Sequence, residues 1–157
     1  MTHYKTDYEP PRAESFINRY SDEALSLLRI VTALLFFLHG TSKLLGFPPF
    51  PMGDVPIYST YWIAGAFELI GGFLLLIGLF SRAAAFLLAG EMAVAYWMVH
   101  APQSTFPSEN GGEAAILYCF IFLLIAAAGP GPWSVDAKIR GYRTLVDDSP
   151  APETDVL

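Results

Sequence analysis

The chain has 157 residues, of which 54% are hydrophobic and 15% are charged, and its formal net charge at pH 7 is -6. An ordinary soluble domain is about 45–50% apolar and about 25% charged. The composition therefore excludes a disordered chain, a collagen and a coiled coil for most of the sequence, and the single cysteine excludes a disulfide scaffold. The negative net charge argues against a nucleic-acid partner, which requires a basic surface. The composition indicates that the lipid bilayer is the main solvent and partner of the chain.

Four apolar stretches follow a polar N-terminal segment at residues 1–23. About 20 predominantly apolar residues cross a bilayer core of about 30 Å, and the stretches cover residues 24–45, 58–80, 83–99 and 114–129. None carries the continuous charged face that a helix of a soluble bundle needs. We therefore expect an all-α fold, a membrane-embedded antiparallel four-helix bundle with four transmembrane helices. It would occupy residues 24–136, followed by a polar, disordered tail at 137–157.

The positive charges predict how this domain is oriented. No apolar core followed by a cleavage site precedes residue 24, so we expect the first stretch to remain as an anchor. The links after the first and third stretches contain no Lys or Arg, whereas the other flanking segments do. The positive residues are Lys5, Arg12, Arg19, Arg82, Lys138, Arg140 and Arg143. Because cytoplasmic segments are enriched in Lys and Arg, we expect both termini to be cytoplasmic.

Several ionisable residues fall inside or at the ends of the apolar stretches. A charged side chain at the bilayer centre costs roughly 2.5–3.5 kcal/mol, so these groups are expected to face the interior of the bundle and to find partners. They form the candidate polar membrane site: Arg29, His39, Lys43, Glu68, Glu91 and Glu113.

Two interpretations of this polar site remain open. It forms a proton path or a pocket for a polar head such as a quinone carbonyl, or its charges only fix the register of the helices. In the second interpretation Glu68 pairs with Arg29 or Lys43, Glu91 is a protonated carboxyl that donates one hydrogen bond, and His39 is a hydrogen-bonded core imidazole. The glycines around Glu68 predict close helix packing.

The sequence does not favour a metal or haem site. His39 and His100 differ in depth by several residues, which argues against a haem between them, and no close ligand spacing supports a metal at these two and Glu113. The sequence contains no nucleophile triad, no phosphate-binding glycine loop and no CxxC motif. It therefore leaves open whether the protein is an enzyme.

Several motifs nevertheless occur together in a recognisable order. They are LLRIVTALLFFLHG, HGTSKLLGF, FELIGGFLLLIGLFSR, GGEAAIL and GPGPWSVD, and they run from about Leu27 to Asp136. In this order and spacing the chain resembles the DoxX family of small membrane proteins, which includes DoxD-like proteins. The resemblance implies a four-span inner-membrane protein. It also implies relatives linked to thiosulfate:quinone oxidoreductase and to a membrane oxidoreductase complex that handles oxidative and thiol stress.

These observations lead to three functional hypotheses. In the first, the protein is the membrane subunit of an oxidoreductase system, acts near quinone or in thiol and oxidative stress, and meets a soluble or membrane redox partner. In the second, it is a scaffold that docks a soluble enzyme and performs no chemistry. In the third, it transports a small solute or protons, although the sequence lacks the broken-helix pairs and inverted repeats of transporters.

Overall fold

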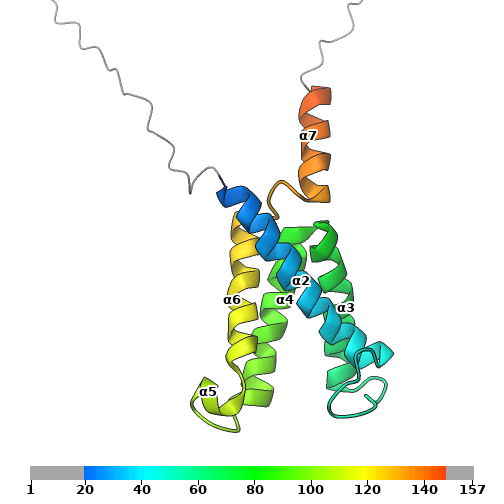
Figure 1. The fold of residues 1–157 in the computed structure, drawn as a ribbon, viewed down its shortest axis with the longest axis vertical. Coiled ribbons are helices and arrows are strands. Elements are labelled where there is room, and N and C mark those ends of the chain that lie inside the picture. The colour runs from blue at the N-terminus through cyan, green and yellow to red at the C-terminus, as the bar shows by residue number, and fades with distance from the viewer. Residues whose placement is uncertain (1–19, 148–157) are drawn as a thin grey trace, which may run out of the picture.

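The structure, a computed structural model, describes residues 20–147 and the side chains of residues 20–141. Within these residues all regular structure is helical (Figure 1). The elements are α2 (Ser21–Leu45), α3 (Thr60–Ile77), α4 (Ser81–Ala95), the π-helical turn η1 (Tyr96–His100), the short α5 (Pro107–Asn110), α6 (Glu113–Ala128) and α7 (Val135–Asp147). The predicted all-α fold is confirmed.

Among the described residues, three helices are long and apolar enough to cross a bilayer. They are α2, α3 and the continuous segment Ser81–His100, which consists of α4 and η1. Helix α6 coincides with the fourth predicted stretch but has 16 residues, which corresponds to about 24 Å at a rise of about 1.5 Å per residue. The apolar stretches thus become helices whose ends lie within a few residues of their predicted positions.

The prediction of a disordered tail from residue 137 is wrong for residues 137–147, which belong to α7. The apolar Val135 and Ile139 are one helical turn apart, and Lys138 and Arg140 lie between and beside them. Such spacing gives a helix one apolar and one polar face. The high charge of this segment obscured this helical pattern in the sequence. The remaining residues of the predicted terminal segments, 1–19 and 148–157, lie outside the described residues.

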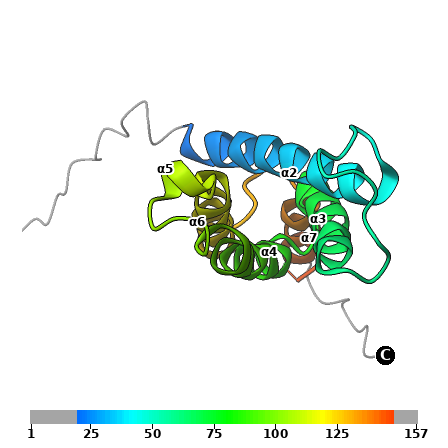
Figure 2. The ribbon, with the colours of Figure 1, turned by 90° about the horizontal axis from the view of Figure 1, so that it is seen from below.

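Helices α2, α3, α4 and α6 follow one another around a shared core (Figure 2). The main contacts are those of α2 with α3 and of α4 with α6, and α3 joins the two pairs by packing on α4. Large side chains from each helix meet in the core, among them Phe36, Leu75, Leu88 and Phe122. Helix α7 projects beyond one end of these helices (Figure 1).

Glycines set the distance and register between α2 and α3. A Cβ atom on Gly40 would lie only 2.7 Å from the Cα of Leu69 and 2.9 Å from the carbonyl oxygen of Gly65. On the other side of the contact, a Cβ on Gly72 would lie 3.0 Å from the Cα of Phe37. The two backbones therefore approach so closely that these positions leave little room for a Cβ atom. The predicted packing role of Gly65 and Gly72 is confirmed.

Two arginines bind helix ends near α7. Arg29 is fully buried, and its guanidinium donates to the carbonyls of Leu75 and Leu76 at the end of α3 and to those of Pro130 and Trp133 in the loop between α6 and α7. Arg82 donates to three carbonyls at the end of α6, those of Ala126, Ala127 and Ala128. Cations at helix C-termini satisfy free carbonyls and oppose the negative end of the helix dipole.

The carboxylate of Asp136 binds the opposite kind of helix end, the N-terminus of α4. Its two oxygens accept from the backbone N–H groups of Phe80 at 3.0 Å and Ser81 at 2.8 Å. Partial burial disfavours the charged carboxylate, but these hydrogen bonds outweigh that effect and hold the pKa of Asp136 below its ordinary value. The residue therefore stabilises the fold in its ionised form.

We expect the stability contributed by Asp136 to be lost in acid. In the unfolded chain its pKa is about 3.9, and a lower folded value means that the stabilisation is full above this pH and disappears as the pH falls through the folded pKa. Asp136→Asn should cost about 1 kcal/mol near neutral pH, as for a lost helix cap. Thermal unfolding in detergent from pH 7 to pH 3 checks this. A difference between the variant and the wild type that stays constant or grows toward pH 3 would contradict it.

Candidate functional site

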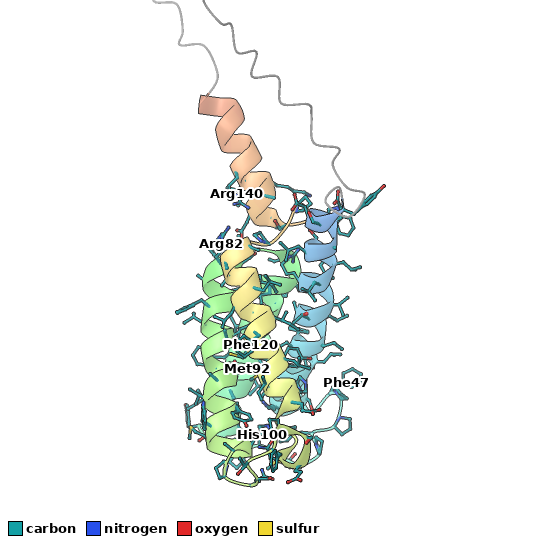
Figure 3. All side chains as sticks on the ribbon, turned by 90° about the vertical axis from the view of Figure 1, so that its left-hand side faces the viewer. Phe47, Arg82, Met92, His100, Phe120 and Arg140 are labelled. Carbon is teal, nitrogen blue, oxygen red and sulfur yellow. The ribbon has the colours of Figure 1, made fainter. Side chains whose placement is uncertain are left out.

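A cavity of about 770 Å³ lies among α2, α3, α4, η1 and α6. Its size falls in the range of about 300–1,000 Å³ that is typical of small-molecule sites. It occupies the half of the molecule away from α7: Figure 3 shows the lining residues Met92 and His100 at mid-height and at the far end, whereas Arg82 lies near α7. The wall is predominantly apolar, so the few polar side chains in it determine what it can bind.

The first polar feature of the cavity is an ion pair between α2 and α3. The Nζ of Lys43 lies 2.5 Å from the Oε1 of Glu68, and both side chains are largely buried. Gly65 makes this possible, since a Cβ there would lie 3.0 Å from the Cβ of Lys43. The second oxygen of Glu68 is buried as well. The pair neutralises the charge of Glu68 but leaves its second oxygen without a hydrogen-bond partner among the described residues.

Glu91 on α4 adds a second carboxyl group to the lining. Both of its oxygens are shielded from the surface, and neither has a hydrogen-bond partner within the part of the chain that the structure describes. A buried carboxyl without a partner is costly. It therefore requires a proton, a ligand or both, and we expect it to form a hydrogen bond with whatever enters the cavity.

Aromatic rings cover the side of the cavity formed by α2 and α6. The imidazole of His39 lies edge-on to the ring of Tyr118, with 6.2 Å between the ring centroids, and 6.4 Å from the ring of Phe36. Phe36 and Tyr118 are themselves 5.3 Å apart. This group presents flat apolar faces together with an imidazole and a phenol, which suits a planar ring that carries polar substituents.

The far end of the cavity is shaped by the π-helical turn η1. Residues Met98, Val99 and His100 of this turn line the cavity. The Nδ1 of His100 lies 2.9 Å from the carbonyl oxygen of Asn110, which ties the turn to α5. Single π-helical turns are rare and occur frequently at functional sites, and this one widens the end of α4 beside the cavity.

The structure brings together four of the six predicted site residues, His39, Lys43, Glu68 and Glu91. The prediction of one common site is wrong for the other two. Arg29 lies toward α7, where it donates to carbonyls and not to Glu68, and Glu113 is exposed in the first turn of α6, outside the cavity lining. Of the two partners predicted for Glu68, Lys43 is the one observed.

The sequence analysis did not assign Tyr118 or Phe36 to the site. Both lie in apolar stretches where one aromatic residue is not distinguished from the next. Tyr118 carried a partial signal, since a tyrosine hydroxyl inside an apolar span needs a polar neighbour. Within the described residues, no three His, Cys, Asp or Glu side chains come close enough to share a metal ion.

Comparison with known proteins identifies the family. A family model described as DoxX matches residues 24–101. An uncharacterized protein of Haemophilus influenzae is 41% identical over 127 residues, which cover 78% of this chain and 95% of that protein. The chain belongs to the DoxX family. This DoxX protein is therefore a membrane protein, in agreement with its three long apolar helices.

Two further relatives of this DoxX protein extend the comparison. A second uncharacterized protein of Haemophilus influenzae is 30% identical over 129 residues, which cover 76% of this chain and 85% of that protein. A Bacillus subtilis protein named "Putative oxidoreductase CatD" is 38% identical over 77 residues, which cover 46% of this chain and 57% of that protein. No solved structure matches the chain.

Proposed function

We propose that this DoxX protein is the membrane subunit of an oxidoreductase system and binds the head of a quinone in its cavity. The observation that carries the proposal is the unpartnered carboxyl of Glu91, which faces a largely apolar cavity beside the Lys43–Glu68 pair. A quinone has a planar ring and two carbonyl oxygens at opposite ends. The cavity offers aromatic faces for such a ring and hydrogen-bond donors for its oxygens.

Each polar residue has a distinct part in the proposed site. A protonated Glu91 donates to one carbonyl oxygen of the quinone, and Lys43, held by Glu68, donates to the other. His39 exchanges a proton through its imidazole ring. The protein thus binds and orients the quinone and supplies protons, while a soluble or membrane redox partner exchanges the electrons. The name of the Bacillus subtilis relative supports an oxidoreductase setting.

The proposal includes a location and a topology. Helix α6 is short, but it packs along α4 over the shared core, and a chain with four spans places both termini on one side. Arg82 and Arg140 lie toward the same end of the molecule, opposite His100 (Figure 3). Under the positive-inside rule this end is cytoplasmic in the inner membrane. The cavity then lies in the outer half of the bilayer.

The alternative function, a scaffold that docks a soluble enzyme, has one supporting observation. Helix α7 projects away from the other helices (Figure 1), and its Ile139 side chain is exposed. A scaffold without a ligand would not need an unpartnered carboxyl in an apolar cavity, because such a group lowers stability. The two functions differ in whether the cavity residues matter, and this difference can be measured.

We expect the purified protein in nanodiscs to bind a decyl-substituted benzoquinone saturably, as followed by quenching of tryptophan fluorescence. Glu91→Leu keeps a side chain of similar size but removes the hydrogen-bond donor, so it should weaken binding by about tenfold, which equals about 1.4 kcal/mol. Glu113→Leu is the matched control, since this glutamate is exposed and outside the cavity lining. Its affinity should equal that of the wild type.

Two outcomes would contradict the proposed function. One is the absence of saturable binding to the wild-type protein. The other is an equal effect of Glu91→Leu and Glu113→Leu, which would mean that the quinone associates with the protein surface or the lipid and not with the cavity. If the protein is only a scaffold, one of these two outcomes is expected.

A further inference from the structure

We infer that the cavity of this DoxX protein opens sideways into the bilayer between α3 and α4, and that the hydrocarbon tail of the quinone occupies this opening. The inference rests on the proposed function, to which it adds the path of the ligand and a second subsite for its tail. The tail subsite consists of Ile63 and Phe67 of α3, Leu87 and Val94 of α4, and Met98 of η1.

These five side chains belong to two surfaces at once. Each lines the cavity, and each is also largely exposed, by 48% for Ile63 and Phe67 and by 55–62% for Leu87, Val94 and Met98. A residue that only closed a cavity would be buried by its neighbours. An apolar residue that reaches both the cavity and the outer surface of the protein marks an opening. The opening between α3 and α4 faces the hydrocarbon region of the bilayer.

The spacing on α4 connects the opening with the polar centre. Leu87, Glu91 and Val94 are separated by four and three residues, so they lie on one face of the helix. The carboxyl of Glu91 therefore stands in the same row as the apolar side chains of the tail subsite. A ligand whose polar head binds Glu91 has its tail directed along this row.

Packing nearer α7 defines where the opening ends. A Cβ on Gly71 would lie 2.7 Å from the Cδ2 of Leu88, so α3 and α4 are in tight contact there. Beyond this contact the two helices are connected at Gly78 by a short turn. In the other direction α4 continues into η1, whose Met98 still lines the cavity. The opening thus occupies the half of the α3–α4 contact away from α7.

The chemistry of the occupant follows from the presence of a buried carboxyl, that of Glu91, beside an apolar opening. A second transmembrane helix seated between α3 and α4 would cover Glu91 with apolar side chains and leave its carboxyl without a partner, which is unfavourable. A molecule with a polar head and a flexible hydrocarbon tail satisfies both parts, since the head reaches the carboxyl and the tail remains in contact with lipid. An isoprenoid quinone has this form.

The experiment compares two quinones with the same ring, one without a tail and one with a decyl tail, and measures binding by isothermal titration calorimetry, because the variants add tryptophans. The double variant Ile63→Trp/Val94→Trp places bulky rings on both walls of the opening. We expect it to weaken binding of the decyl quinone by about tenfold and to leave the affinity for the tail-less quinone within about twofold, because the smaller ligand does not need the opening. The matched control is Ile70→Trp, an exposed α3 residue outside the cavity lining.

A second measurement uses the wild-type protein alone and does not depend on the variant folding. A decyl quinone with a photoactivatable diazirine at the end of its tail is bound in nanodiscs and illuminated, and labelled peptides are mapped by mass spectrometry. We expect labels on residues 63–67 and 87–98. Labelling of residues 46–59 or 101–112 instead would overturn the lateral opening, as would equal weakening of both quinones by the double variant. If tailed and tail-less quinones both fail to bind the wild type, the proposed function falls together with this inference.

Discussion

Arg29→Leu is expected to remove a large part of the stability of the folded protein. The fully buried guanidinium donates to carbonyls at the end of α3 and in the loop that precedes α7. Leucine leaves these carbonyls buried and unpaired, at a cost of about 1–3 kcal/mol for each group that finds no new partner. We therefore expect a loss of at least about 3 kcal/mol, which is a large part of the 5–15 kcal/mol of a typical domain.

Thermal unfolding in detergent measures this loss, and Arg82→Leu is the matched control. Arg82 also donates to carbonyls at a helix end, but its side chain is exposed, so water can replace it and the cost should be about 1 kcal/mol. Arg29→Lys should unfold earlier than the wild type and still bind quinone with unchanged affinity while folded. Weakened binding by the folded Arg29→Lys protein would show that Arg29 belongs to the binding site after all.

The helices of this protein could be predicted from the sequence because lipid imposes a simple requirement on length and polarity. A stretch of about 20 apolar residues has to become a helix, since no other structure satisfies its backbone hydrogen bonds within a bilayer. The C-terminal ends of two helices could also be predicted, because Gly46 and Gly78 follow α2 and α3 in the left-handed conformation that favours glycine. The missed element, α7, lies outside the apolar stretches, where this requirement does not act.

The composition of the site was predictable only in part, because it depends on contacts between distant residues. Arg29 and Glu68 looked like partners by charge, yet the acceptors of Arg29 at Pro130 and Trp133 are more than 100 positions away. An arginine that binds carbonyls has no charged partner whose presence the sequence could reveal. For Lys43 the partner became clear only through the close approach at Gly65.

A single and a double variant of the Lys43–Glu68 pair separate stability from ligand binding. Lys43→Met alone leaves the nearly buried carboxylate of Glu68 without its cation, which is expected to cost about 3–5 kcal/mol. Replacing both residues, as Lys43→Met/Glu68→Leu, removes the unpaired charge together with its partner. Apolar pairs of similar volume commonly equal or exceed the stability of a buried ion pair, so the double variant should recover most of the loss in a thermal unfolding experiment.

The double variant then makes binding the decisive measurement. If the ion pair only held α2 against α3, a refolded apolar pair would leave quinone affinity near the wild-type value. The proposed site instead needs the ammonium of Lys43 as a donor to the quinone, so we expect binding to be weakened by at least tenfold although stability is restored. Restored stability with wild-type affinity would reduce the pair to a structural element, and the case for a quinone site would then rest on Glu91 and His39 alone.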